Sequence, residues 1–260
     1  MIDNMLNRQN NPDNWWYAMG DSKKTVLSIL GLNTIIFGLW NMFVAKVFSI
    51  YCVRPSFEHF MYKYFLSSIT HKSSLTLITS MFSHSTVAHF AFNAIAFYTI
   101  GSSLCELVGR EQMLAIFLGG TCQTLFNILG GLMSSLTSHY FRLALRSPAG
   151  SLGASGGVFA LLTAYASLNP QANFALIFLP IFPIPASTLV PVLIGFDAIG
   201  LTGIWRKMFG WSLDHAGMYV VTIMIICEGH LGGALFGIFY VEAYLGRLKE
   251  RLASRPTRRR

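Results

Sequence analysis

A serine at position 155 stands in a frame of small residues, Gly153-Ala154-Ser155-Gly156-Gly157, at the start of an apolar stretch. Small neighbours leave its hydroxyl uncovered and let another helix approach closely. Both properties suit a nucleophile that must meet a base on a neighbouring helix. Plain helix packing uses such clusters too, so the frame alone does not decide. It also fits the G-x-S-x-G elbow of soluble hydrolases, but that elbow follows a strand, and the surrounding sequence is apolar throughout.

A histidine at position 230 lies in the last apolar stretch, within Gly229-His230-Leu231-Gly232-Gly233. Unpaired ring nitrogens are unfavourable inside a membrane, so a histidine there is a candidate functional residue. A neutral imidazole can accept the serine proton and return it to a leaving amine. The alternative is a histidine that only bonds a backbone carbonyl. Gly233 and Gly237 form a small-xxx-small face beside it.

Three more polar residues, His84, His89 and Asn93, mark the head of an earlier apolar stretch. His89 and Asn93 are four apart, share one helix face and are expected to donate hydrogen bonds to a developing oxyanion. Zinc is the competing interpretation, but His84 and His89 lie on different faces and H-E-x-x-H is absent, so no metal is expected.

An aspartate at position 197 lies in the fifth apolar stretch. Three roles remain open for it: a triad acid that orients His230, a buried protonated acid, or a polar residue beside a water-filled cleft. Nothing in the spacing links it to His230.

The bulk composition predicts a membrane protein. Of 260 residues, 53% are hydrophobic and 12% charged, about half the charged fraction of a soluble domain, roughly 25%. The apolar residues come in long runs, which predict an all-α polytopic helix bundle with a six-span core. The spans are expected at residues 25–44, 84–107, 111–136, 152–168, 186–205 and 218–245.

The segments outside the core are polar or amphipathic. Residues 1–24 have neither a secretory h-region nor an Arg-rich transit pattern,. Residues 45–83 suit an amphipathic segment in the interface. The basic tail, 246–260, is expected to meet anionic lipid rather than nucleic acid. Residues 174–182 are too short to cross a membrane, and the prolines around them, with the fifth span, predict a gate. The four cysteines, at 52, 105, 122 and 227, form no metal or redox pattern,.

At these residues the chain resembles the rhomboid family, whose pattern is H-x4-H-x3-N, then G-x-S-G, then a histidine before Gly-Gly. Here these are His84/His89/Asn93, Gly153–Gly156 and His230. Details such as Ser151-Leu152-Gly153-Ala154-Ser155-Gly156 and the eight residues from His230 to Gly237 are similar to the mitochondrial presenilin-associated rhomboid-like subgroup. The match runs over about residues 25–245, which are expected to be the protease domain.

The resemblance implies a serine endopeptidase with a Ser155/His230 dyad and no acid, oxyanion donors His89 and Asn93, and supporting residues Gly153, Gly156 and His84. It implies single-span membrane proteins as substrates, the lipid bilayer as a partner, no cofactor, and a multi-pass protein of the mitochondrial inner membrane. A catalytically impaired rhomboid-like protein that binds membrane clients is the alternative, although such members usually lack the serine or histidine. A transporter would show inverted repeats, and none is seen.

Three departures from the family stand out. The 260 residues are expected to begin after the extra helix that animal mitochondrial members carry ahead of the six-span core. Phe159 stands four residues after Ser155, where bacterial members of the family often have a tyrosine. Residues 217–228 lengthen the approach to His230 by about 18 Å of helix, which would push His230 along its helix or bulge out. Because these residues can be encoded with splice-site-like edges, we hypothesise an unspliced intron or rare splice form. The alternative is a genuine extension of the last helix.

Overall fold

The computed structural model describes residues 16, 19–44, 55–66, 76–84, 86–121, 153–176, 179–201 and 215–254. For residues 215–229, and for a few positions at the ends of other elements, it describes the backbone alone. Several predicted features therefore lie outside the described residues: the second half of the third span, the connection from it to the fourth span, the side chain of Cys227, and Cys52 and Cys122.

Helices lie in all six of the predicted spans, as far as the described residues reach, and the predicted all-α membrane bundle is confirmed. Within the described residues, Val87–Val108 is the helical stretch that is long and apolar enough to cross a bilayer, and Ser155–Leu168 and Ala186–Ile199 are shorter apolar helices. The helices are α3 (Asp21–Val44), α6 (Val87–Ala96) continuing through the π-helical η3 (Phe97–Gly101) into α7 (Ser102–Val108), α8 (Arg110–Thr121), α11 (Ser155–Leu168), α12 (Ala186–Leu201) and α14 (His215–Tyr244).

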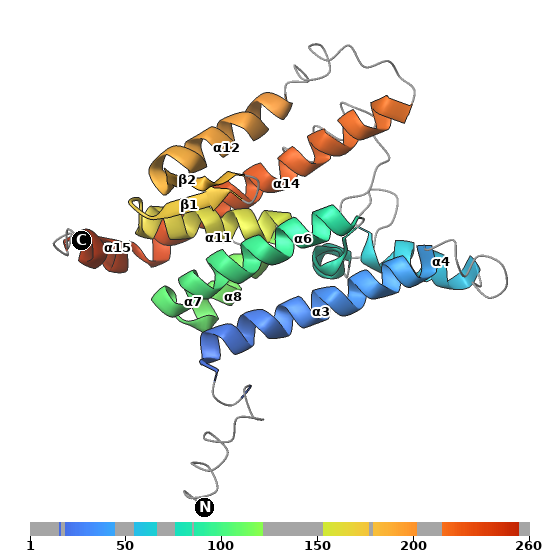
Figure 1. Ribbon diagram of the computed structural model, residues 1–260, viewed down its shortest axis with the longest axis horizontal. Coiled ribbons are helices and arrows are strands. Elements are labelled where there is room, and N and C mark those ends of the chain that lie inside the picture. The colour runs from blue at the N-terminus through green and yellow to red at the C-terminus, as the bar shows by residue number, and fades with distance from the viewer. Residues whose placement is uncertain are drawn as a thin grey trace, which may run out of the picture.

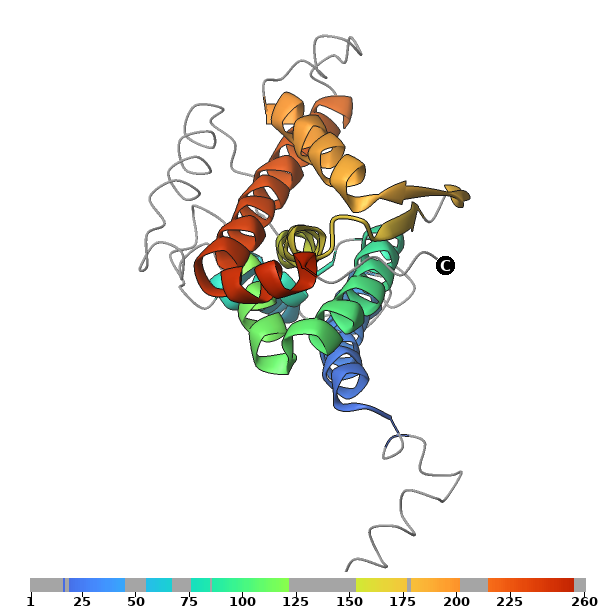
Figure 2. The ribbon, with the colours of Figure 1, turned by 90° about the vertical axis from the view of Figure 1, so that its left-hand side faces the viewer.

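Helix α11 is the centre of the bundle. Figure 2 looks along it and shows α6, α8, α12 and α14 around it. Its small residues make this possible: a Cβ at Gly120 of α8 would overlap the Ala160 side chain, and one at Gly237 of α14 would overlap the Ala160 carbonyl. Thr163 Oγ1 donates a hydrogen bond to the Ala234 carbonyl at 2.9 Å and ties α11 to α14. Helix α11, which begins at Ser155, is therefore in close contact with α14, which carries His230.

Two amphipathic helices flank this core. In α4 (Pro55–Phe65), within the predicted interfacial segment, Met61 is buried against Ile36 and Trp40. The short α5 (Thr76–Thr79) and η2 (Ser80–Phe82) lead from there toward α6. In α15 (Gly246–Ala253), which begins the basic tail, Leu248 and Leu252 pack against the core while the arginines face outward. Both helices have the form of interfacial segments.

The segment before the fifth span is a β-hairpin, which the expectation of a purely helical fold did not include. β1 (Asn173–Leu176) pairs antiparallel with β2 (Leu179–Pro185), with Asn173 opposite Pro185 and Phe174 opposite Ile184. Prolines are tolerated because both strands of a two-stranded sheet are edges, where a missing N–H costs little. The hairpin ends at Pro185, and α12 begins at the next residue, Ala186.

Candidate active site

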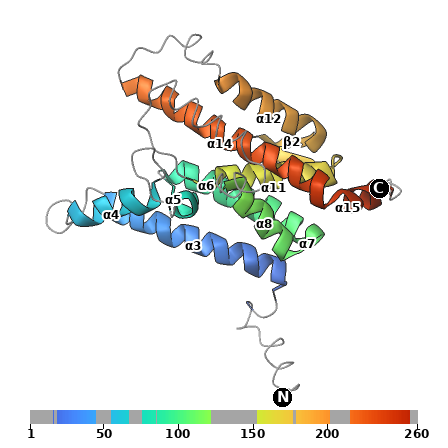
Figure 3. The same cartoon turned by 180° about the vertical axis from the view of Figure 1, so that it is seen from behind.

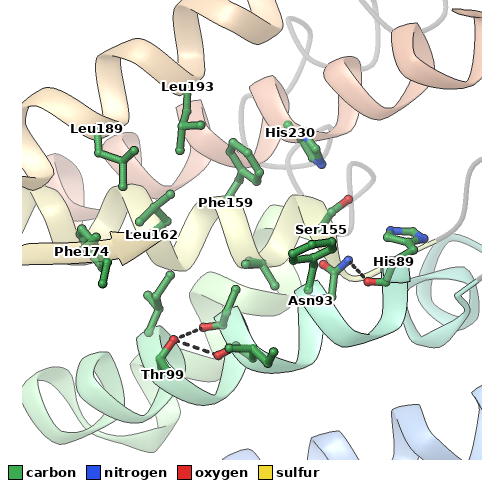
Figure 4. Close-up of a pocket in the computed structure, with 16 residues that line it drawn as sticks. His89, Asn93, Thr99, Ser155, Phe159, Leu162, Phe174, Leu189, Leu193 and His230 are labelled. Carbon is green, nitrogen blue, oxygen red and sulfur yellow. Dashed lines mark hydrogen bonds between the residues drawn. The ribbon is translucent and has the colours of Figure 1, made fainter. Parts of the chain in front are cut away.

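A pocket of about 480 Å³ lies among α6, α11, α12, α14 and β1. Four of the residues predicted to do chemistry line it: His89 and Asn93 from α6, Ser155 from α11 and His230 from α14. Figure 4 shows these side chains at one end of the pocket. The fold thus brings together residues that lie up to 141 positions apart in the sequence.

Ser155 is the first residue of α11, and the two glycines that follow it are buried. The first N–H groups of a helix have no acceptor within the helix, so they remain available to an anion beside the serine. Gly156 is held against α14, because a Cβ at Gly233 would overlap the Gly156 carbonyl oxygen. The supporting role predicted for Gly156 thus has a physical basis in this contact.

His230 lies flat on Phe159, with ring centroids 4.1 Å apart and an interplanar angle of 9°. Its ring and the Ser155 hydroxyl point toward one another (Figure 4). No hydrogen bond joins these two described side chains, and catalytic hydrogen bonds are commonly long before substrate binds. Stacking fixes the plane of the imidazole and leaves its edge free for proton transfer.

Asp197 lies beside His230, with Oδ2 at 3.4 Å from His230 Nδ1. Asp197 is 5% exposed, and Oδ2 has no hydrogen-bond partner among the described residues. This is ion-pair distance without hydrogen-bond geometry. The resemblance implies a dyad with no acid, whereas here a buried carboxylate faces the candidate base. Of the three roles left open by the sequence, the position beside His230 favours the triad acid.

His89 and Asn93 are adjacent on the first turns of α6. The Thr86 side chain accepts a hydrogen bond from His89 N at 3.1 Å and caps the helix. Asn93 Nδ2 donates to the His89 carbonyl at 2.8 Å, as the dashed line in Figure 4 shows. An asparagine amide has two N–H donors, so the second remains available to the pocket.

Gly153 and His84 both lie against the His89 ring. Gly153 has φ +123°, and a Cβ there would lie 2.8 Å from His89 Cε1. Its N–H donates to the Ser80 carbonyl at 2.9 Å. His84 is 1% exposed and meets His89 edge to face at 5.1 Å. Both residues therefore restrict the orientation of the His89 ring. Within the described part of the chain, no three His, Cys, Asp or Glu side chains lie close enough together to form a metal site.

Sequence reasoning did not identify Phe159 as the stacking partner of His230, and it left the contact of Asp197 with His230 as one of three alternatives. The sequence of α12 does contain a signal that Asp197 faces the pocket. Leu189, Leu193 and Asp197 are spaced by four residues, so they share a helix face, and both leucines line the pocket,.

Residues 217–228 lie inside α14, which is a continuous helix from His215 to Tyr244. Figures 1 and 3 both show α14 projecting past the end of α12. His230 nevertheless lines the pocket with Ser155, so the added turns extend the helix beyond the site rather than displacing His230.

We expect a variant that lacks residues 217–228 to be labelled at Ser155 by a fluorophosphonate, a reagent for nucleophilic serines, at least as fast as the full chain. The reason is that the close contacts of α14 with α11 at Gly233, Ala234 and Gly237 lie after the segment. Labelling rates of the two forms check this, and slower labelling of the deletion would make the segment an integral part of the site. Sequencing the transcript tests the splicing hypothesis, which fails if all mature messages contain the twelve codons.

Comparison with known proteins decides the family. The Rhomboid domain matches residues 71–247 of this chain. The chain belongs to the rhomboid family. It is 32% identical over 230 residues to presenilin-associated rhomboid-like protein A, mitochondrial, of Danio rerio, which covers 88% of this chain and 50% of that protein. The Homo sapiens presenilin-associated rhomboid-like protein, mitochondrial, is 31% identical over 229 residues, or 87% and 50% of the two chains.

Rhomboid protein 1, mitochondrial, of Saccharomyces cerevisiae is 29% identical over 227 residues, 86% of this chain and 54% of the yeast protein. This rhomboid thus spans about half the length of the curated relatives it matches. Members of the family are intramembrane proteases. The predicted family, its mitochondrial group and the placement in a mitochondrial membrane are confirmed, while the inner membrane in particular stays a prediction.

Proposed function

We propose that this rhomboid is an intramembrane serine endopeptidase in which Ser155 is the nucleophile and His230 the general base. The observation that carries the proposal is that both side chains line one pocket inside an apolar bundle and point toward one another. The protease domain would comprise residues 25–245.

The geometry gives each group a task. Ser155 Oγ attacks the scissile carbonyl while His230 accepts the hydroxyl proton. The oxyanion that forms would receive hydrogen bonds from His89, from the free N–H of Asn93 and from the backbone N–H of Ser155 at the start of α11. His230 then returns the proton to the leaving amine. Water, activated by the same histidine, hydrolyses the acyl-enzyme and restores Ser155.

The substrates would be single-span membrane proteins. A peptide bond must leave its helix before it can reach Ser155, and this unwinding is easiest where small or helix-breaking residues weaken the segment. The catalytically impaired client-binding protein remains the second candidate. The presence of both Ser155 and His230 in one pocket favours the protease.

A fluorophosphonate reagent tests the function directly. The full chain, in detergent micelles or liposomes, should be labelled covalently, and peptide mapping should place the label on Ser155. A label on another serine would assign the nucleophile elsewhere. A chain that is folded but does not react would support the client-binding alternative.

Replacing either oxyanion donor, His89→Ala or Asn93→Ala, is expected to lower kcat about 10²–10³-fold, the usual cost of one such donor. Thr99→Ala is the matched control, because Thr99 also lines the pocket but its hydroxyl bonds the Ile95 and Ala96 carbonyls of its own helix at 2.9 and 3.2 Å. Turnover of a membrane-peptide substrate measures the effect. Activity that requires added zinc and is lost to chelators would overturn the assignment.

Asp197 is proposed as a positioning residue for His230. Asp197→Asn is expected to lower kcat at least about 10-fold and leave KM unchanged, a smaller loss than the roughly 10⁴-fold seen for the fully hydrogen-bonded aspartate of soluble triads. The contact of 3.4 Å, without hydrogen-bond geometry, explains the smaller loss. Asp197→Glu should recover part of kcat because it keeps the carboxylate. If kcat is unchanged in Asp197→Asn, the site is a dyad.

A further inference from the structure

Thr163 is a buried polar residue of α11 that has no part in the proposed chemistry. It lies eight residues after Ser155, about 12 Å along the helix,, and the residue is 1% exposed. A valine at this position would have nearly the same shape and no polar group to satisfy. A hydroxyl inside an apolar span is therefore a feature that packing alone does not explain.

The Thr163 hydroxyl lies within hydrogen-bond distance of three carbonyl oxygens. Two belong to its own helix, that of Phe159 at 3.0 Å and that of Ala160 at 3.2 Å, as is usual for a threonine within a helix,. The third and nearest, that of Ala234 at 2.9 Å, belongs to α14. Because a hydroxyl has one proton to donate, α11 and α14 share it. One oxygen atom therefore links the backbones of the two helices.

The two ends of this link lie next to the stacked rings of the active site. Phe159 carries one of the rings, and its own carbonyl is an acceptor for Thr163. Ala234 follows His230 by four residues, so it lies about one turn further along the same face of α14. The rings of Phe159 and His230 are 4.1 Å apart at an angle of 9°. Stacking this close requires a fixed spacing and a fixed rotation of both helices, and the link is made one turn away.

Loss of the bond between the helices should affect position more than folding. A Cβ at Gly237 would overlap the Thr163 hydroxyl, so this glycine of α14 leaves the room that the bond needs. If the hydroxyl moves away from Ala234, it still has carbonyl acceptors in its own helix. Helix α11 then keeps its hydrogen bonds, whereas α14 loses a constraint on its rotation. Hydrogen bonds of this kind between membrane helices are individually weak, so the fold does not depend on one of them.

We propose that Thr163 is a positioning residue for His230: its hydroxyl joins α11 to α14 beside the Phe159–His230 stack and thereby holds the imidazole edge toward Ser155. The proposal rests on the proposed function. Thr163 contacts neither the reacting atoms nor the pocket lining, so its loss should lower the rate of the chemical step and leave the affinity for reagent or substrate unchanged,.

Thr163→Val tests this role, because valine keeps the shape and removes the hydroxyl. Labelling by a fluorophosphonate gives the maximal rate, kinact, and the half-saturating concentration, KI. In this reaction Ser155 Oγ bonds to phosphorus, the P–F bond breaks, fluoride leaves with the electron pair, and His230 takes the serine proton. We expect kinact to fall about tenfold, less than the roughly 10²-fold that a misplacement of 1 Å can cost, with KI unchanged.

Two variants control for the substitution. Thr163→Ser should keep most of the wild-type kinact, because it retains the hydroxyl. Thr34→Val in α3 should be fully active, because Thr34 is an exposed helical threonine whose hydroxyl bonds the Leu30 carbonyl of its own helix at 2.7 Å. Thermal unfolding in detergent micelles checks that each variant is folded. If Thr163→Val does not fold, Thr163→Cys, which has a weak donor, takes its place.

A double variant separates positioning from general stability. In Phe159→Ala the stack is absent, so the further change Thr163→Val should lower kinact less than about twofold, the scatter expected for uncoupled sites. The proposal is overturned if Thr163→Val reacts like Thr34→Val, if Thr163→Ser loses as much as Thr163→Val, or if the full loss persists in Phe159→Ala. Failure of the folded wild-type chain to be labelled would instead overturn the proposed nucleophile.

Discussion

Ser155→Ala is expected to abolish fluorophosphonate labelling and to lower cleavage of a membrane substrate at least about 10⁴-fold. Removal of the nucleophile of a serine protease costs about 10⁶-fold in kcat, and binding with oxyanion stabilisation retains about 10³–10⁴-fold over water. Alanine is compatible with this position, because Ser155 starts a helix and is only partly buried. The variant should therefore keep its fold, which thermal unfolding in detergent micelles checks.

His230→Ala should cost about as much as Ser155→Ala, and the double variant hardly more, since the two residues act as one unit. Ser103→Ala is the matched control, because Ser103 is an exposed helical serine whose hydroxyl bonds the Thr99 carbonyl at 2.9 Å. Cleavage that persists in Ser155→Ala at the rate of the control would remove Ser155 from the mechanism.

The residues of the candidate site were easier to identify from the sequence than the contacts between them. Ser155, His230, His89 and Asn93 stand out because polar residues are rare in apolar spans, and all four line one pocket. The spans themselves follow from hydropathy, which depends on local composition alone. Hydropathy and the rare polar residues within apolar spans are both properties of short stretches of sequence, so both can be recognised without a structure.

Contacts between spans were harder to predict. Asp197 and His230 are 33 residues apart, and their distance of 3.4 Å depends on how α12 and α14 are rotated about their own axes. The β-hairpin was missed because its prolines indicate only that a helix is broken. The length of residues 217–228 predicted that His230 would be pushed along its helix or that the segment would bulge out, because length alone does not show that packing at Gly233 and Gly237 sets the position of α14.

That packing makes Gly233→Ala the substitution with the largest expected effect on stability. The added Cβ would overlap the Gly156 carbonyl oxygen and lie 2.7 Å from the Gly156 carbonyl carbon. Neither is a flexible side chain that can turn aside, so α11 and α14 must separate. Overpacking of this kind costs about 1–3 kcal/mol and occasionally more. Alanine is otherwise the better helix former, by about 1 kcal/mol, so any destabilisation reports the collision.

The same separation of α11 and α14 should also lower the rate of the reaction at Ser155. Gly156 follows Ser155 directly, and Gly233 lies less than one turn after His230, so a shift of the helices changes the distance between nucleophile and base. A misplacement of about 1 Å can cost about 10²-fold in rate, and we expect at least that loss of labelling. Gly38→Ala in α3, where nothing lies within 4 Å of the new Cβ, should be neutral or stabilising and fully active.

Gly237→Ala separates the effect on stability from the effect on catalysis. Its Cβ would overlap the Ala160 carbonyl and the Thr163 hydroxyl, about two turns from His230. We expect a comparable loss of stability but a smaller loss of labelling, because the strain falls further from the reacting groups. Thermal unfolding and labelling rates of the three variants decide the matter. If Gly233→Ala unfolds and reacts like Gly38→Ala, then the close contact of α11 with α14 is not what holds Ser155 and His230 together.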